Sequence, residues 1–261
     1  MKSQPQIFSE SIDQDAYLQW ILTWKKCRHG ELGDCFHYYV PPFSNQQITD
    51  SPQGPRLVRH AYFYQTKEVW DDLLNFAEEG LTIRIHMAVR GASSPEQGPQ
   101  FNPLAQAISS SGQSEFIPLK PLQELSFPGK NQGQELAGKV PAPFMTQLVK
   151  NWMNTHPGYL CDQFETTQFE EKGNPESSLI RQRVNYFTFE AKDVESMKKI
   201  KNYERLYLHL GVNHNDDYQQ RPSFAPVLHF AKPVPQSEVL PPNPGEDDDY
   251  YEYASPCPAI C

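Results

Sequence analysis

The chain has 261 residues, of which 38% are hydrophobic and 21% are charged, a balance that supports a packed core and argues against wholesale disorder. It carries 32 Asp and Glu against 23 Lys and Arg, and the net charge of −9 disfavours nucleic acid as a partner because phosphate backbones repel it. The chain has no apolar run of the roughly 18 residues that a spanning helix needs, and its first residues are too polar for a signal peptide. Five cysteines are an odd number and too few for a disulfide scaffold, so we expect a cytoplasmic protein with reduced thiols and no membrane partner.

The first predicted unit covers residues 14–110 and opens with an amphipathic helix. This helix is predicted to begin at Asp15 and to stop at the turn His29-Gly30. Its apolar residues recur at i, i+1, i+4 and i+5, which places them on one helical face. They are Tyr17, Leu18, Ile21 and Leu22.

Four strands and a second helix complete this unit. Strands are predicted at 35–40 and 56–64, a helix from Lys67, and further strands at 81–87 and 101–104. In the third strand apolar residues alternate strictly with polar ones, which is the pattern of a half-buried strand. The alternating residues are Leu81, Ile83, Ile85 and Met87.

A similar order of elements returns in residues 143–231, after a predicted linker rich in proline and glycine at 111–142. The shift is 127 residues for the first helix and 125 for the alternating strand, so that Ile83 corresponds to Leu208. We interpret the pattern as an internal duplication. It predicts an α+β fold with antiparallel sheets and two similar helix–strand–strand–helix–strand–strand units about a pseudo-twofold axis. An α+β protein without duplication is the alternative.

The C-terminal tail, residues 232–261, contains seven prolines and an acidic run, which favours an extended chain over a helix or a central strand. Extended proline-rich segments lose little entropy on docking, and tyrosines supply contact area. Tyr250, Tyr251 and Tyr253 are therefore candidate partner-binding residues, for the chain's own sheet or for a neighbouring subunit. A disordered solubilising tail is the alternative.

A candidate metal site lies in two Cys-x-His pairs, Cys27 with His29 and Cys35 with His37. Thiolate and imidazole are preferred zinc ligands, and residues two apart on a strand point to the same side. The glycines between the pairs allow the loop to bring all four residues together, so zinc is the one cofactor that the sequence suggests. The alternative is a turn at the end of a helix with half-buried cysteine and histidine side chains.

A candidate ligand site comes from the placement of arginine and histidine. Most arginines fall in or beside predicted strands, and Arg84 and His86 lie opposite the alternating apolar residues. The shift of 125 puts His209 in the place of Arg84. A planar guanidinium suits carboxylate or phosphate, so we predict that these residues and Arg59 bind an anionic ligand or an acidic segment. A solvated sheet face paired with Glu and Asp is the alternative.

These features favour a non-catalytic binding or assembly protein, with a protein partner or self-association. It would use a groove between the units or the polar sheet face, together with the tail. No glycine-rich phosphate loop and no nucleophile elbow occurs in the sequence. The alternative is an enzyme, metal-dependent or acting on a small anionic substrate in the groove, in which Arg84, His86 and His209 take part, together with the segment from Cys27 to His37.

Overall fold

The computed structural model describes residues 14–40, 56–77, 79–92, 98–121, 142–169, 179–213, 224–231, 249–251 and 254–258. Within these residues, helices combine with antiparallel sheets, so the predicted α+β class is confirmed. None of the helices in these stretches has the length and apolar character required to cross a membrane.

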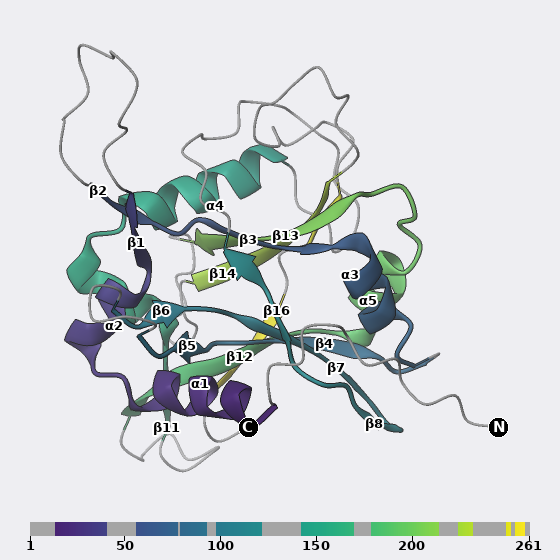
Figure 1. Ribbon diagram of the computed structural model, residues 1–261, viewed down its shortest axis with the longest axis horizontal. Coiled ribbons are helices and arrows are strands. Elements are labelled where there is room, and N and C mark those ends of the chain that lie inside the picture. The colour runs from purple at the N-terminus through teal and green to yellow at the C-terminus, as the bar shows by residue number, and fades with distance from the viewer. Residues whose placement is uncertain are drawn as a thin grey trace.

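Two large sheets form the body of the structure (Figure 1). The five-stranded sheet has the order β10-β3-β13-β14-β15 and consists of β3 (Tyr62–Thr66), β10 (Lys120–Pro121), β13 (Arg205–Val212), β14 (Phe224–Ala231) and β15 (Asp249–Tyr251). The seven-stranded sheet has the order β11-β12-β4-β7-β8, with β16 on β12 and β9 on β7. It consists of β4 (Thr82–His86), β7 (Leu104–Ser109), β8 (Gly112–Gln113), β9 (Ile117–Pro118), β11 (Glu165–Phe169), β12 (Leu179–Phe189) and β16 (Ala254–Pro258).

Alternating apolar side chains of both sheets meet in one core. Ile83 and Ile85 of β4 are fully buried, as are Leu206 and Leu208 of β13. These residues belong to a single buried cluster that also includes Phe63 from β3. Burial of one face of each strand explains the period of two in the sequence, because successive strand side chains point to opposite sides.

The two predicted units interleave in this core. The chain passes from β3 in the five-stranded sheet through α3 (Lys67–Leu74) to β4 in the seven-stranded sheet. In the second unit it passes in the opposite direction, from β12 through α5 (Ala191–Met197) to β13. Central pairs β3–β13 and β12–β4 therefore join strands of different units, and core side chains fill the space where the sequence led us to expect a groove.

One long helix packs on each sheet, α1 (Gln14–Lys26) near the seven-stranded sheet and α4 (Ala142–Asn154) on the five-stranded sheet (Figure 1). Helix α1 buries Tyr17, Ile21 and Trp24, which recur at i, i+4 and i+7. The predicted buried stripe was therefore partly wrong, because Leu18 and Leu22 are 46% and 39% exposed. The buried stripe is narrower than predicted and extends one turn further along the helix, to Trp24.

The segment after α1 differs from the prediction. Residues expected to form a turn and the first part of a strand make a helix, α2 (His29–Cys35), and the strand β1 (His37–Val40) starts two residues later than expected. The backbone N–H of Arg28 donates to the carboxylate of Glu31 at 3.2 Å, which satisfies a donor at the helix start. The predicted strand 56–64 is also divided, into β2 (Arg56–Arg59), which pairs with β1, and β3.

Segments predicted as linker and tail contribute edge strands. Strands β8, β9 and β10 lie in the first part of 111–142, and the rest of that segment, 122–141, is outside the described residues. In the tail, β15 pairs with β14 and β16 pairs with the second half of β12. The tail backbone therefore extends both large sheets of its own chain, at their edges and not on their faces. The remaining small pairs are β1–β2 and β5 (Val89–Arg90) with β6 (Gln100–Phe101).

Candidate functional site

The outer face of the seven-stranded sheet carries the best candidate site. On β4 the side chains alternate, so Arg84 and His86 lie opposite the core-facing isoleucines. The strand register sets His86 beside Tyr186 of β12, and Arg84 beside Thr188 of β12 and Gln106 of β7. Residues directly opposite each other in antiparallel strands share a face, so these five side chains form one patch.

His86 is buried in this patch and holds no charge at neutral pH. Its Nε2 lies 3.0 Å from Oε1 of Gln106, to which it donates, and Nε2 of Gln106 donates to the carbonyl of Ser114 at 3.0 Å. Burial lowers the pKa of His86 to about 4. The hydrogen bond to Gln106 raises this pKa, while the positive charges of Arg84 and Lys25 lower it. The imidazole therefore orients its neighbours as a neutral donor.

Arg84 holds a positive charge that no carboxylate of the described residues neutralises. Its guanidinium carbon lies 4.6 Å from the ring centroid of Tyr186, and its Nε is buried without a hydrogen-bond partner. Among the described ion pairs none involves Arg84 or Lys25. A buried guanidinium donor without an acceptor is costly unless a ligand satisfies it, so this position is suited to an anion.

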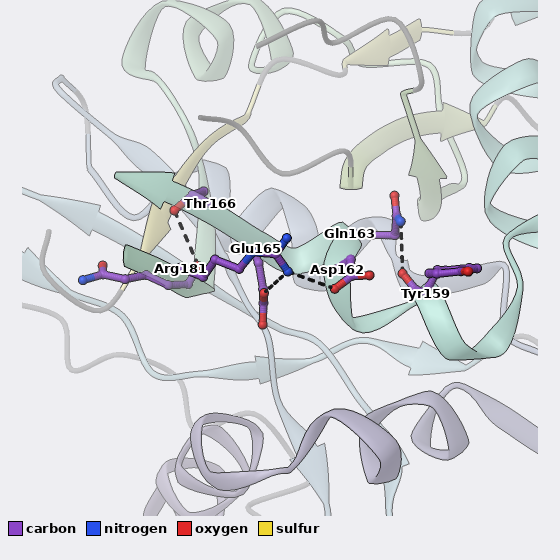
Figure 2. A network of polar contacts seen from close by, with 7 residues as sticks. Tyr159, Asp162, Gln163, Glu165, Thr166 and Arg181 are labelled. Atoms are coloured by element: carbon purple, nitrogen blue, oxygen red, sulfur yellow. Dashed lines mark hydrogen bonds and ion pairs between the residues drawn. The ribbon is translucent and has the colours of Figure 1, made fainter. Parts of the chain in front are cut away.

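Arg181 of β12, unlike Arg84, has carboxylate partners (Figure 2). Its Nη1 lies 3.6 Å from Oδ1 of Asp162 and 3.7 Å from Oε2 of Glu165. Figure 2 shows this guanidinium directed at the two carboxylates, beside the hydrogen bond of the Gln163 amide to the carbonyl of Tyr159 at 3.0 Å. The charge of Arg181 is thus already paired within the chain.

Two further strand arginines cap helices. Nη1 of Arg183 donates to the carbonyl of Trp24 at the end of α1, and its guanidinium carbon lies 5.7 Å from the ring centroid of Trp24. Nη1 of Arg59 donates in the same way to the carbonyl of Trp152 at the end of α4, with a ring distance of 5.6 Å. A guanidinium there satisfies orphan carbonyls and complements the helix dipole. Arg59, a predicted ligand residue, therefore binds the end of α4. It comes from β2, which is not a strand of the seven-stranded sheet that carries the patch.

His209 lies on the outer face of the other sheet. Its Nε2 is 3.0 Å from Nδ1 of His229, and its ring centroid is 4.9 Å from that of Tyr62. Both histidines are buried, and burial, followed by the neighbouring His229, holds the pKa of His209 well below its ordinary value. The predicted ligand set is therefore divided, since Arg84 and His86 share one face and His209 is on another.

The strand registers relate these two faces. His86 lies opposite a tyrosine on one neighbouring strand and bonds Gln106 on the other, while His209 lies opposite Tyr62 and bonds His229. A shift of 123 residues carries His86 to His209 and Gln106 to His229. This relation is two residues shorter than the predicted shift of 125, which set His209 in the place of Arg84.

The candidate metal site is only partly assembled. The thiols of Cys27 and Cys35 meet, and Cys161, from the short helix η2 (Cys161–Phe164), lies beside them. Burial raises the pKa of Cys35 to about 12 and that of Cys161 to about 11, so both thiols stay protonated at neutral pH. The sequence did not predict that Cys161 joins the other two, because nothing local relates residues so far apart in the chain.

The histidines of the motif are placed differently. Nδ1 of His37 lies 2.9 Å from the carbonyl of Gly33, and Nε2 accepts a long hydrogen bond of 3.5 Å from Arg59. The side chain of His29 is outside the described residues. In the described part of the chain, no group of three or more His, Cys, Asp or Glu side chains is arranged to hold a metal ion.

The predicted partner residues of the tail are placed only in part. Backbone pairing puts Tyr250 opposite His229 and Tyr251 opposite Leu228, and their side chains and all of Tyr253 lie outside the described residues. Taken together, the described residues offer one positive patch, around Arg84, whose Nε is buried without an acceptor. The Nε of Arg183 is also buried without an acceptor, but Nη1 of Arg183 is bonded to backbone carbonyls. Burial raises the pKa of all three thiols, Cys27, Cys35 and Cys161. Comparison with protein-family models, with curated proteins and with solved structures finds no match to this chain.

Proposed function

We propose that the chain is a non-catalytic binding protein that accepts an acidic segment of a partner protein on the outer face of the seven-stranded sheet. The observation that carries the proposal is the buried Nε of Arg84, which has no acceptor, beside an exposed Lys25 and a neutral His86. The carboxylate of the partner would pair with the guanidinium of Arg84, whose side chain is partly exposed. Nucleic acid is disfavoured as the anion because the chain as a whole carries a charge of −9.

We infer that the two faces descend from one duplicated unit. The matched His86–Gln106 and His209–His229 pairs support a common origin, and so do the matched arginine caps at the ends of α1 and α4. The sheets also have equivalent central orders, β12-β4-β7 and β3-β13-β14. The pseudo-twofold axis relates strands across the core.

Divergence between the two faces favours the seven-stranded sheet as the binding face. The shift of 123 sets Tyr207 in the place of Arg84 and His229 in the place of Gln106. Tyr207, His209 and His229 are all buried, and their rings contact one another at tilted angles with centroid distances of 5.1–6.3 Å. The equivalent face of the five-stranded sheet thus has no cation at this position and serves packing.

The test uses a fluorescent poly-glutamate peptide as the probe and fluorescence anisotropy as the measurement. Arg84→Gln should weaken binding about tenfold, the effect of losing one charged hydrogen bond of about 1.5 kcal/mol. Arg181→Gln is the matched control, because that arginine is paired with Asp162 and Glu165. Equal binding by wild type and Arg84→Gln, or an equal loss in the control, would contradict the proposal.

A further inference from the structure

Three cysteines that are distant in sequence gather where α1, α2 and η2 pack together. Cys27 follows α1, Cys35 ends α2 and Cys161 begins η2. Cys35 and Cys161 are buried, while Cys27 is partly exposed. Solvent therefore reaches this group of thiols through Cys27.

Glu31 holds two of the thiols next to each other. Sγ of Cys27 donates to Oε2 of Glu31 at 3.9 Å, and Sγ of Cys35 donates to the carbonyl of the same residue at 3.3 Å. The two thiols also lie close to each other. Because Glu31 is in the first turn of α2 and Cys35 is one turn later, the helix itself fixes this spacing.

We propose that Cys27 and Cys35 form a reversible disulfide when the chain meets hydrogen peroxide, and that Cys27 is the residue that reacts with the oxidant. The thiol of Cys27 first releases its proton. Its sulfur then attacks one peroxide oxygen, the O–O bond breaks, and the departing hydroxide combines with the released proton to form water. Cys27 is then a sulfenic acid. Sγ of Cys35 loses its proton and attacks Sγ of Cys27, the S–O bond breaks, and a second water leaves.

The neighbouring groups favour this pair over other outcomes. The carboxylate of Glu31 accepts a hydrogen bond from the Cys27 thiol, and the closeness of the thiols lets Cys35 trap the sulfenic acid before further oxidation. Burial raises the pKa of the Cys27 thiol, so the first step should accelerate as the pH rises.

The experiment exposes the reduced full-length chain to hydrogen peroxide, blocks free thiols with N-ethylmaleimide, and maps tryptic peptides by mass spectrometry. Trypsin cuts after Lys26, Arg28 and Arg56, so the expected product is the dipeptide Cys27-Arg28 joined to the peptide 29–56. Treatment with dithiothreitol should separate the two peptides.

Two variants make the test specific. Cys27→Ser changes a partly exposed residue and should abolish the linked product, whereas Cys161→Ala should retain it. Retention of the link when Cys257 and Cys261 are both replaced by Ser would exclude exchange with the tail and support the proposal. The proposal is overturned if peroxide leaves Cys27 as a sulfinic or sulfonic acid with no link. A link from Cys27 to Cys161 or to the tail, in place of Cys35, would overturn it equally.

Discussion

The indole Nε1 of Trp24 donates a hydrogen bond of 2.9 Å to the backbone carbonyl of Val184, 160 residues away in the sequence. Trp152 repeats this relationship in the other direction, with a hydrogen bond of 2.7 Å to the carbonyl of His60. Both rings are fully buried. Each of the two long helices is therefore anchored to the other predicted unit, α1 to β12 and α4 to the link between β2 and β3.

Replacement of either tryptophan by phenylalanine should destabilise the chain to a similar extent. Trp24→Phe and Trp152→Phe each leave a buried carbonyl without its donor and open a small void, which together cost about 2–4 kcal/mol. Urea denaturation followed by circular dichroism measures the loss. Trp20→Phe is the control with an expected loss under about 1 kcal/mol, because Trp20 is only half-buried and a phenylalanine ring can keep the edge-to-face contact with Tyr17. A loss confined to one of the two anchors would contradict their equivalence.

Stability should fall as the medium is acidified from neutral pH. Burial lowers the pKa of His60 and of His86 to about 4, below the ordinary value of 6.5. Between these values the unfolded chain binds protons that the folded chain excludes, so stability is full above pH 6.5 and is lost as the pH falls toward 4. At pH 5 the expected loss is about 2 kcal/mol for each histidine.

Urea denaturation at several pH values measures this dependence. His86→Gln should remove the contribution of His86 to the pH dependence, since glutamine does not titrate. The free energy of unfolding should then fall less steeply as the pH is lowered. An unchanged slope in that variant would mean that other groups cause the loss.

Replacement of two glycines by alanine should change the stability of the chain in opposite directions. A Cβ on Gly211 of β13 would lie 2.7 Å from the carbonyl oxygen of Ala225 and 2.8 Å from Cβ of Leu148, so Gly211→Ala should cost about 1–3 kcal/mol. A Cβ on Gly30 of α2 would meet nothing within 4 Å, so Gly30→Ala should gain about 0.5–1 kcal/mol. Thermal denaturation of both variants checks the pair, and a gain at Gly211 would refute the close packing of α4 on the sheet.

Removal of residues 240–261 should lower the melting temperature and promote association. The deletion takes away β15 and β16 and so leaves the edges of β14 and β12 unpaired. A loss of about 2 kcal/mol corresponds to a fall of roughly 4–8 °C, measured by calorimetry, with oligomeric state measured by light scattering. Asp247→Asn with Asp248→Asn is the control, because it lowers the charge of the tail without shortening it. Unchanged stability and mass after the deletion would contradict docking of the tail.

The parts of the fold that the sequence predicted are those set by local periodicity. The alternation at Ile83 and Ile85 predicted β4, and the same pattern at Leu206 and Leu208 predicted β13. The helix α2 was missed because its seven residues include two glycines, which hid a helix that depends on Glu31 and on packing of Leu32. Pairing of β3 with β13 was beyond reach because it depends on contacts between residues more than a hundred positions apart.

The sequence likewise predicted part of the candidate site and missed the rest. Strand alternation correctly set Arg84 and His86 on one face, because side-chain direction follows from the period of two. It gave no information on whether a guanidinium has a partner, so Arg59 and Arg84 looked alike in the sequence. Only the fold separates Arg59, which caps α4, from Arg84, whose Nε is unsatisfied.

The pairing of Phe63 with Leu208 spans 145 positions of the chain and affects how the protein is made. At 5–20 residues per second, a ribosome needs on the order of ten seconds to deliver the second strand after the first has emerged. During that interval the nascent N-terminal segment presents an apolar surface and an open strand edge to every neighbouring polypeptide. Holdase chaperones bind such surfaces, so synthesis in a cell-free system without them should yield mostly aggregate.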